Sequence, residues 1–210
     1  MVTKGRLEAF SDGVFAIVIT LLAFDLKRPD VGTDASLASA LWDQWPAYLA
    51  YFVGFLQIGV MWLNHHRLFQ QVRAVDGVLL VLNLNLLMWV ALVPFATGVV
   101  ADHLRDGGQN AATAMALFSG VLLANAISFV GLFSWITHDE RITGTLPPPA
   151  VVRAARIRFG VGLGAYLGAL GLSFVVPYAA LAVHAIMALY YAFDQATVAS
   201  EASAQGAPPP

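Results

Sequence analysis

The first apolar segment of the chain carries a carboxylate near each of its ends. It reads RLEAFSDGVFAIVITLLAFDL from Arg6 to Leu26, with Asp12 near its start and Asp25 near its end. A charged side chain at membrane depth is costly unless it is paired or hydrated, so Asp12 needs a partner or water. Twelve residues separate the two aspartates, and they span roughly 18 Å, less than a hydrocarbon core of about 30 Å. The segment therefore predicts a membrane helix with a short apolar middle and polar ends.

Two histidines, His65 and His66, lie near the end of the second apolar segment, in the sequence WLNHHRLF. Adjacent residues on a helix diverge by about 100°, whereas a helical metal pair favours i, i+4 spacing. The chain also has no Cys and hence no thiolate ligand. We therefore predict no metal site, and we expect one of these histidines to be the partner of Asp12, because both lie near the same membrane surface.

Two further polar residues, Asp76 and Asn83, stand seven residues apart on one face of the third apolar segment. Buried amides in a helix bundle usually hydrogen-bond to a neighbouring helix, and we interpret Asn83 in this way. His184 is the one histidine of the last apolar run. We expect it to be a hydrogen-bonded structural residue.

Sequence motifs typical of enzymes are missing. The chain has no Walker A motif, no Rossmann glycine pattern, no G-x-S-x-G and no H-E-x-x-H. We therefore predict that the protein is not an enzyme and has no cofactor. Haem ligation by histidines of two different apolar segments is the one cofactor chemistry that the residues leave open.

The composition is that of a membrane protein. Hydrophobic residues make up 59% of the chain and charged residues 11%, and the mean hydropathy is +0.71, whereas soluble domains are about 25% charged. The formal net charge of −2 gives no indication of a nucleic-acid partner. We expect the first segment to be a retained span, since no small-residue cleavage site follows it.

Uncharged runs predict an all-α, polytopic membrane protein with six transmembrane helices. The last run, 159–193, is too long for one helix, and Pro177 near its middle divides it into two. We expect a single domain over residues 1–194 and a disordered tail at 195–210, which is small, polar and proline-rich. The predicted helices span residues 7–27, 46–70, 75–101, 110–137, 152–175 and 177–194.

The distribution of Lys and Arg predicts the orientation. With the N-terminus inside, the inner segments contain eight Lys and Arg residues and the outer segments contain three. The positive-inside rule then favours cytoplasmic N- and C-termini for a multi-pass protein of the cell membrane. The eight inner residues are Lys4, Arg6, Arg67, Arg73, Arg141, Arg153, Arg156 and Arg158, and the three outer ones are Lys27, Arg28 and Arg105.

One stripe of the first helix is apolar apart from a single threonine. At 100° per residue, Asp12 lies about 140° around the axis from Ile17, so the acid and the stripe face different ways. The stripe could pack on a neighbouring helix while Asp12 faces water, or it could line a narrow central path while Asp12 finds a partner in its own subunit. The stripe consists of Gly13, Ile17, Thr20, Leu21 and Phe24.

The opening segment also contains the pattern R-x-x-x-F-S-D-G followed by A-I-x-I-T. This pattern resembles the signature of the transmembrane protein 175 family of potassium channels, in its short bacterial six-helix form. WLNHHRLF and LNLNLL…VPF in the next two segments are similar to that family as well. The resemblance covers roughly residues 6–194. It implies a homotetramer in the lipid membrane, with the first helix of each subunit lining a central pore that has no P-loop filter.

The resemblance also implies roles for individual residues. Ile17, Leu21 and Phe24 would form a hydrophobic constriction, with Phe24 where Leu or Ile is usual, and Thr20 would favour potassium. The residues of the R-x-x-x-F-S-D pattern would form a structural network with the second and third segments rather than line the pore. The expected members of this network are Arg6, Phe10, Ser11, Asp12, His65, His66, Asp76 and Asn83.

We therefore expect a potassium-favouring cation channel with passive conduction and K⁺ as the permeant ion. An alternative is a secondary transporter or proton-coupled carrier of a small solute, which would have saturable flux and usually internal repeats. The sequence has no second copy of the opening motif. A third hypothesis is a structural or binding membrane protein without flux.

Overall fold

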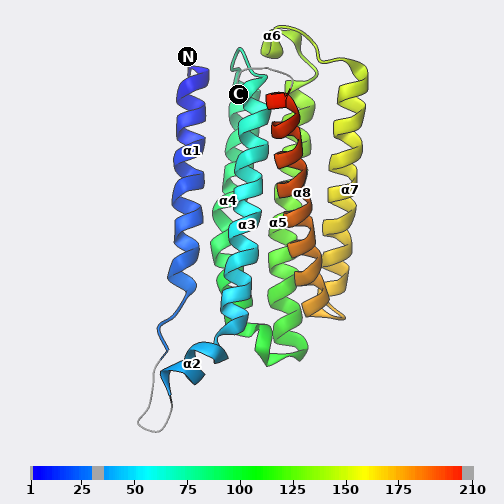
Figure 1. Ribbon diagram of the computed structural model, residues 1–210. Coiled ribbons are helices and arrows are strands. Elements are labelled where there is room, and N and C mark those ends of the chain that lie inside the picture. Colours follow the sequence, from blue (N-terminus) through cyan, green and yellow to red (C-terminus); the bar gives the residue numbers. More distant parts are fainter. Residues whose placement is uncertain (1, 30–35, 205–210) are drawn as a thin grey trace.

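The computed structural model describes residues 2–29 and 36–204, and it describes side chains as far as Phe193. Over these residues the chain is all-helical (Figure 1). The elements in chain order are α1 (Lys4–Leu21), η1 (Leu22–Asp25), α2 (Leu37–Asp43), α3 (Trp45–Gln70), α4 (Gly77–His103), η2 (Leu104–Asp106), α5 (Gly108–Ile136), α6 (Glu140–Thr143), α7 (Pro149–Ser173) and α8 (Pro177–Ala204).

The long helices run side by side in one bundle, with α1 at one edge and α7 at the opposite edge (Figure 1). Helix α1 packs against α3 and α4, while α7 packs against α5 and α8. The core between them contains large side chains with no exposed surface, including Ile58, Phe69, Leu86 and Leu122. The two edge helices therefore each have one face on the bundle and one face directed away from it.

The first four long helices of the described chain are long and apolar enough to cross a membrane. The fourth of them, α5, has a mean hydropathy of 2.0 over its most apolar 18 residues. Helix α8 contributes only a shorter apolar stretch, Pro177–Phe193, and α7 is not among the candidates. Three arginines in the first half of α7 explain its lower hydropathy. The sequence predicts six spans. The fifth and sixth of them correspond to α7 and α8, which lie in the same bundle as the other four.

Four features differ from the predicted elements. The first helix, predicted over residues 7–27, is α-helical over Lys4–Leu21 and continues as the 3-10 turn η1 to Asp25. The short helix α2 was not expected; its N-cap is Ser36, whose hydroxyl accepts a hydrogen bond from Ser39 N at 3.1 Å. The four-residue helix α6 is a second addition. Helix α8 reaches Ala204, so residues 195–204 are helical where disorder was predicted. That stretch contains four Ala and neither Gly nor Pro, a composition that permits helix. Residues 205–210 of the predicted tail lie outside the described residues.

A glycine allows η1, α3 and α4 to approach closely. A Cβ atom at Gly54 of α3 would lie 2.8 Å from Thr97 Oγ1 of α4 and 3.3 Å from Leu22 Cδ2. Thr97 and Leu22 are both buried, so neither can easily move away. Gly54 is therefore required by packing rather than by backbone conformation.

Gly54→Ala is expected to destabilise the protein by about 1–3 kcal/mol, the usual cost of overpacking. Gly120→Ala on α5 is the matched control, since a Cβ there meets nothing within 4 Å and Ala stabilises a helix relative to Gly by about 0.5–1 kcal/mol. Thermal unfolding in detergent measures both variants. A melting temperature of Gly54→Ala equal to or higher than that of the unmodified protein would contradict the packing role of Gly54.

Candidate functional site

One face of α1 is buried in the bundle. Its buried residues recur at intervals of three or four positions, so they form a single stripe along the helix. Because α1 packs on α3 and α4, this stripe lies against those two helices. The stripe consists of Leu7, Ser11, Phe15 and Val18, and it continues into η1 at Leu22.

The other face of α1 and the adjoining η1 expose large apolar side chains. The exposed fractions are 61% for Ile17, 42% for Leu21 and 81% for Phe24. Thr20 is exposed beside them, and its hydroxyl donates to the carbonyl of Ile17 at 2.7 Å. The stripe predicted from the sequence is therefore uncovered in the single subunit. An apolar stripe of this kind on an edge helix is typical of a surface that another chain or the membrane covers.

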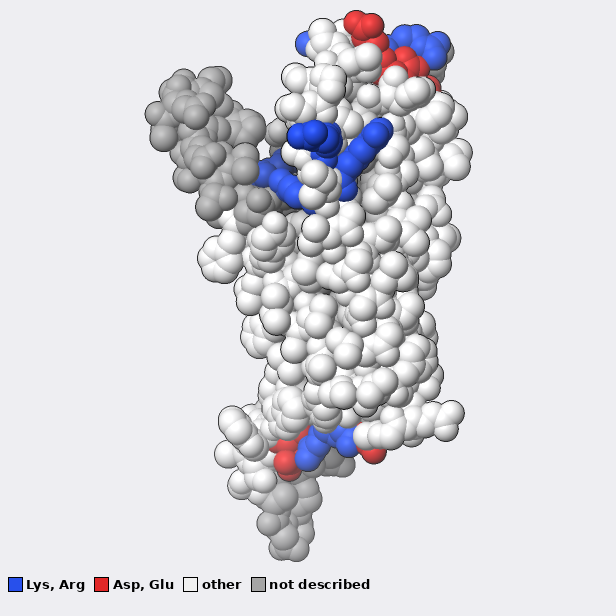
Figure 2. All heavy atoms as spheres, turned by 90° about the vertical axis from the view of Figure 1, so that its right-hand side faces the viewer, with Lys and Arg blue, Asp and Glu red and all other residues white. Residues whose placement is uncertain are grey.

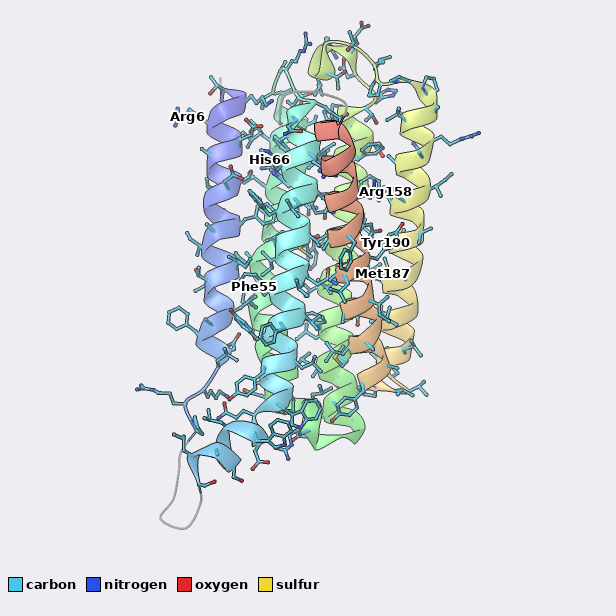
Figure 3. The ribbon with its side chains drawn as sticks, viewed as in Figure 1. Arg6, Phe55, His66, Arg158, Met187 and Tyr190 are labelled. Carbon is cyan, nitrogen blue, oxygen red and sulfur yellow. The ribbon has the colours of Figure 1, made fainter. Side chains whose placement is uncertain are left out.

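Two residues of the R-x-x-x-F-S-D pattern lie on this exposed face as well. Phe10 is 54% exposed. Arg6 is exposed and points away from α3 and α4 (Figure 3). Both lie within about 20° of Ile17 around the helix axis, since they precede it by seven and eleven positions. Within the described subunit, neither joins the network predicted for them.

Ser11, Asn83 and His65 do come together, in a buried chain of hydrogen bonds across three helices. Asn83 Nδ2 of α4 donates to Ser11 Oγ of α1 at 3.0 Å, and Ser11 Oγ donates to the carbonyl of Leu7 at 2.9 Å. His65 Nε2 of α3 pairs with Asn83 Oδ1 at 2.8 Å, which assigns the proton to that nitrogen. All three side chains are at most 1% exposed. The amide of Asn83 thus links α1 to α3.

The partner of Asp12 is a tryptophan, not a histidine as predicted. Trp62 Nε1 of α3 donates to Asp12 Oδ1 at 2.9 Å, and the Trp62 ring stacks on His66 with centroids 5.9 Å apart. Gln70 Nε2 lies 3.2 Å from His66 Nε2. Trp62 and His66 are four residues apart and share a face, whereas His65 is turned into the core. The donor is the indole N–H of Trp62, which only the packing of α3 against α1 brings to Asp12.

Asp76 has a separate role from the one predicted. It is the N-cap of α4, accepting from Leu79 N at 2.7 Å, and both its carboxylate oxygens lie 3.3 Å from Trp135 Nε1 of α5. It therefore fixes the start of α4 against α5 and does not contact the Ser11 chain. An aspartate directly before a helical apolar run is a recognisable N-cap, so this role was readable from the sequence.

The segment that follows α1, in η1 and just after it, is attached to α4 by charge and close packing. Lys27 Nζ lies 2.7 Å from Asp102 Oδ1. Asp25 packs on Gly98, where a Cβ atom would lie 2.8 Å from Asp25 Oδ1. This attachment could not be predicted from the sequence, because Lys27 and Asp102 are 75 residues apart. Helix α1 is thus held by hydrogen bonds at its middle and through the segment that follows it. Among the described residues, no group of three or more His, Asp or Glu could hold a metal ion.

Comparison with known proteins places these features in a family. A family model described as "Endosomal/lysosomal potassium channel TMEM175" matches residues 6–94, the region of α1, α3 and most of α4. A potassium channel of Streptomyces collinus is 45% identical over 201 residues, covering 96% of this chain and 97% of the relative. A potassium channel of Chamaesiphon minutus is 38% identical over 190 residues, covering 90% of this chain and 93% of the relative.

A solved structure is similar as well. The crystal structure of a lysosomal potassium-selective channel TMEM175 homologue from Chamaesiphon minutus aligns with a TM-score of 0.82 and 38% identity. The alignment covers 91% of this chain and 97% of that one. The similarity therefore extends over nearly the whole bundle.

Asn83→Ala is expected to lower the free energy of unfolding by about 1–3 kcal/mol, because it leaves both Ser11 and His65 without their partner in the core. Asn85→Ala is the matched control. It removes one half-buried bond, from Asn85 Nδ2 to Ser128 Oγ at 2.7 Å, worth about 0.6 kcal/mol. Unfolding in mixed SDS micelles measures both. Equal losses would indicate that Asn83 has no special role in attaching α1.

Proposed function

The chain belongs to the TMEM175 family of potassium channels, and from this premise we propose that it is a potassium-favouring cation channel with passive conduction. The family is one of ion channels, not of enzymes. We propose that four subunits surround a central pore and that α1 of each subunit lines it. The permeant ion is K⁺.

The exposed stripe of α1 is the observation that carries this proposal. Its three large side chains are 42% to 81% exposed, although the opposite face of the same helix is buried and held by hydrogen bonds. A single subunit therefore presents an apolar surface in a fixed orientation. Four such surfaces around an axis would face one another and leave a narrow path between them, so α1 is the element best placed to line it.

In this arrangement Ile17, Leu21 and Phe24 form successive apolar rings. Narrow hydrophobic rings can gate a channel by excluding water. Ile17 lies near the middle of the apolar segment between Asp12 and Asp25, so we propose its ring as the narrowest point. In this proposal the pore has no P-loop selectivity filter.

Thr20 is the polar group within this apolar path. Its hydroxyl hydrogen is directed to the carbonyl of Ile17 at 2.7 Å. The oxygen lone pairs are then the part of Thr20 available to a cation. We propose that Thr20 contributes to the preference for potassium.

We propose that Ser11, Asn83, His65, Asp12 and Trp62 are positioning residues and do not touch the ion. Their hydrogen bonds join α1 to α3 and α4 on the side away from Ile17. They would fix the rotation of α1 about its axis. The rings of the tetramer then stay aligned because each subunit holds its own helix.

We propose six membrane spans, formed by α1, α3, α4, α5, α7 and α8, with both termini in the cytoplasm of a cell-membrane channel. Figure 2 shows an uncharged band between Lys and Arg side chains at the two ends of the α7 side of the molecule. The excess of Lys and Arg on the N-terminal side of the membrane, eight against three, supports this orientation.

The purified protein in liposomes with opposed potassium and sodium gradients is expected to give a current that reverses on the potassium side and does not saturate. Empty liposomes are the control. Slow, saturable flux would favour a secondary transporter or a proton-coupled carrier of a small solute. A monomer without flux would favour a structural membrane protein.

Ile17→Asn is expected to raise potassium conductance about tenfold, since a polar ring hydrates the constriction and a barrier lower by roughly 1.4 kcal/mol gives that factor. Ile157→Asn on α7 is the matched control, because it is the same residue type with the same exposed fraction, 61%, at the opposite edge of the bundle. Single-channel recording of both tetramers measures the effect. An unchanged conductance for Ile17→Asn would move the constriction elsewhere.

A further inference from the structure

The first half of α7 carries three arginines, which divide between two environments. Arg153 and Arg156 are exposed, whereas Arg158 is half-buried and lines the interior between α3, α5 and α7. Figure 2 shows Lys and Arg gathered toward one end of this side of the molecule, above an uncharged band. Among the side chains that the structure describes, no carboxylate pairs with Arg153 or Arg156. Two cations therefore face outward at the edge of the apolar band.

A groove adjoins Arg156 between α5 and α7. Its volume is about 220 Å³. The rings of Phe133 and Phe159 meet in it with centroids 5.1 Å apart. Gly160 leaves one wall open, since nothing lies within 4 Å of a Cβ built there. The groove has a cation at one end and apolar walls, and its lining residues are Val130, Phe133, Ser134, Arg156, Phe159, Gly160 and Leu163.

The groove runs along α7 from the charged end toward the apolar middle. Arg156 and Leu163 are seven residues apart, so their positions differ by about 10 Å along the helix. A headgroup at Arg156 would thus place the first part of an acyl chain beside Gly160 and Leu163. This is the arrangement of polar and apolar groups in a membrane lipid.

The position of α7 decides between lipid and a second subunit as the occupant. Helices α1 and α7 form opposite edges of the bundle (Figure 1). If α1 faces the central axis, the outer face of α7 is directed away from it, toward lipid. This step rests on the proposed tetramer.

We propose that the groove between α5 and α7 binds an anionic phospholipid of the inner leaflet. The guanidinium of Arg156 binds the phosphate through charge-assisted hydrogen bonds, and Arg153, three residues earlier on the helix, adds a second positive charge. The acyl chain lies over Phe159 and Gly160. The site would connect the lipid composition of the membrane to the outer layer of the channel.

The test is the thermal stability of the full-length protein in neutral detergent, titrated with phosphatidylglycerol, phosphatidylcholine or inorganic phosphate. Phosphatidylglycerol is expected to raise the melting temperature at lower concentration than phosphatidylcholine, and phosphate alone is expected to have no effect. Arg156→Gln should raise the phosphatidylglycerol concentration that gives the same rise in melting temperature by about fivefold. This factor corresponds to the contribution of one interfacial arginine. Arg28→Gln is the control, since Arg28 is exposed at the opposite end of the bundle.

A second pair of variants tests the apolar part of the groove with Arg156 intact. Gly160→Leu fills the groove and should weaken the phosphatidylglycerol effect severalfold. Gly168→Leu makes the same change on α7 outside the groove, where a Cβ also meets nothing within 4 Å, and should leave the effect unchanged. Equal responses in these two variants would exclude the groove as the binding site.

The outcomes separate this proposal from the proposed function. Stabilisation that is equal for both lipids, or unchanged in Arg156→Gln, overturns the lipid site even if the protein is a conducting tetramer. Protection by inorganic phosphate alone also overturns it. Native mass spectrometry of the same samples gives the oligomeric state. A monomer that prefers phosphatidylglycerol through Arg156 would support the lipid site and reject the tetramer.

Discussion

The amide of Asn83 links α1 to α3 through buried hydrogen bonds, and the pore-lining role proposed for α1 depends on the direction in which this attachment holds the helix. Asn83 binds Ser11 on α1 and His65 on α3, and all three side chains are buried. Apolar packing alone permits a helix to rotate by small amounts, because dispersion contacts have little directionality. Hydrogen bonds at about 3 Å have a narrow angular range. A buried polar group with defined partners is therefore what holds the Ile17 stripe in one direction.

This attachment explains why polar residues and an apolar stripe occur on the same helix. Ser11 and Asp12 are adjacent, yet one contacts α4 in the core and the other contacts Trp62 of α3 at the surface. Together they hold α1 from two sides. The face opposite these contacts is exposed in the single subunit, so in the proposed tetramer its side chains are available to line the pore. In the proposed channel, stability and conduction thus depend on different sides of one helix.

The sequence predicts much of this arrangement and misses specific parts of it. Long uncharged runs place α3, α4 and α5 within two residues of their observed ends, because helical spans in lipid must be continuous. Periodicity alone separates Ile17 from Asp12. The pairing of Asp12 with Trp62 could not be predicted, since it depends on which face of α3 packs against α1. The same holds for Lys27 and Asp102, which only the fold brings together.

The short apolar segment of α1 follows from what lies at its two ends. Asp12 is bound by Trp62 at one end, and at the other Asp25 packs on Gly98 beside the ion pair of Lys27 with Asp102. A lipid-facing helix would need apolar residues over about 30 Å. A helix that lines a pore meets water at both mouths, so charge is tolerated there. The free-energy barrier to dehydrating an ion becomes smaller as the apolar part of the pore becomes shorter. In the proposed pore, the two aspartates therefore mark the length of the hydrophobic barrier to ions.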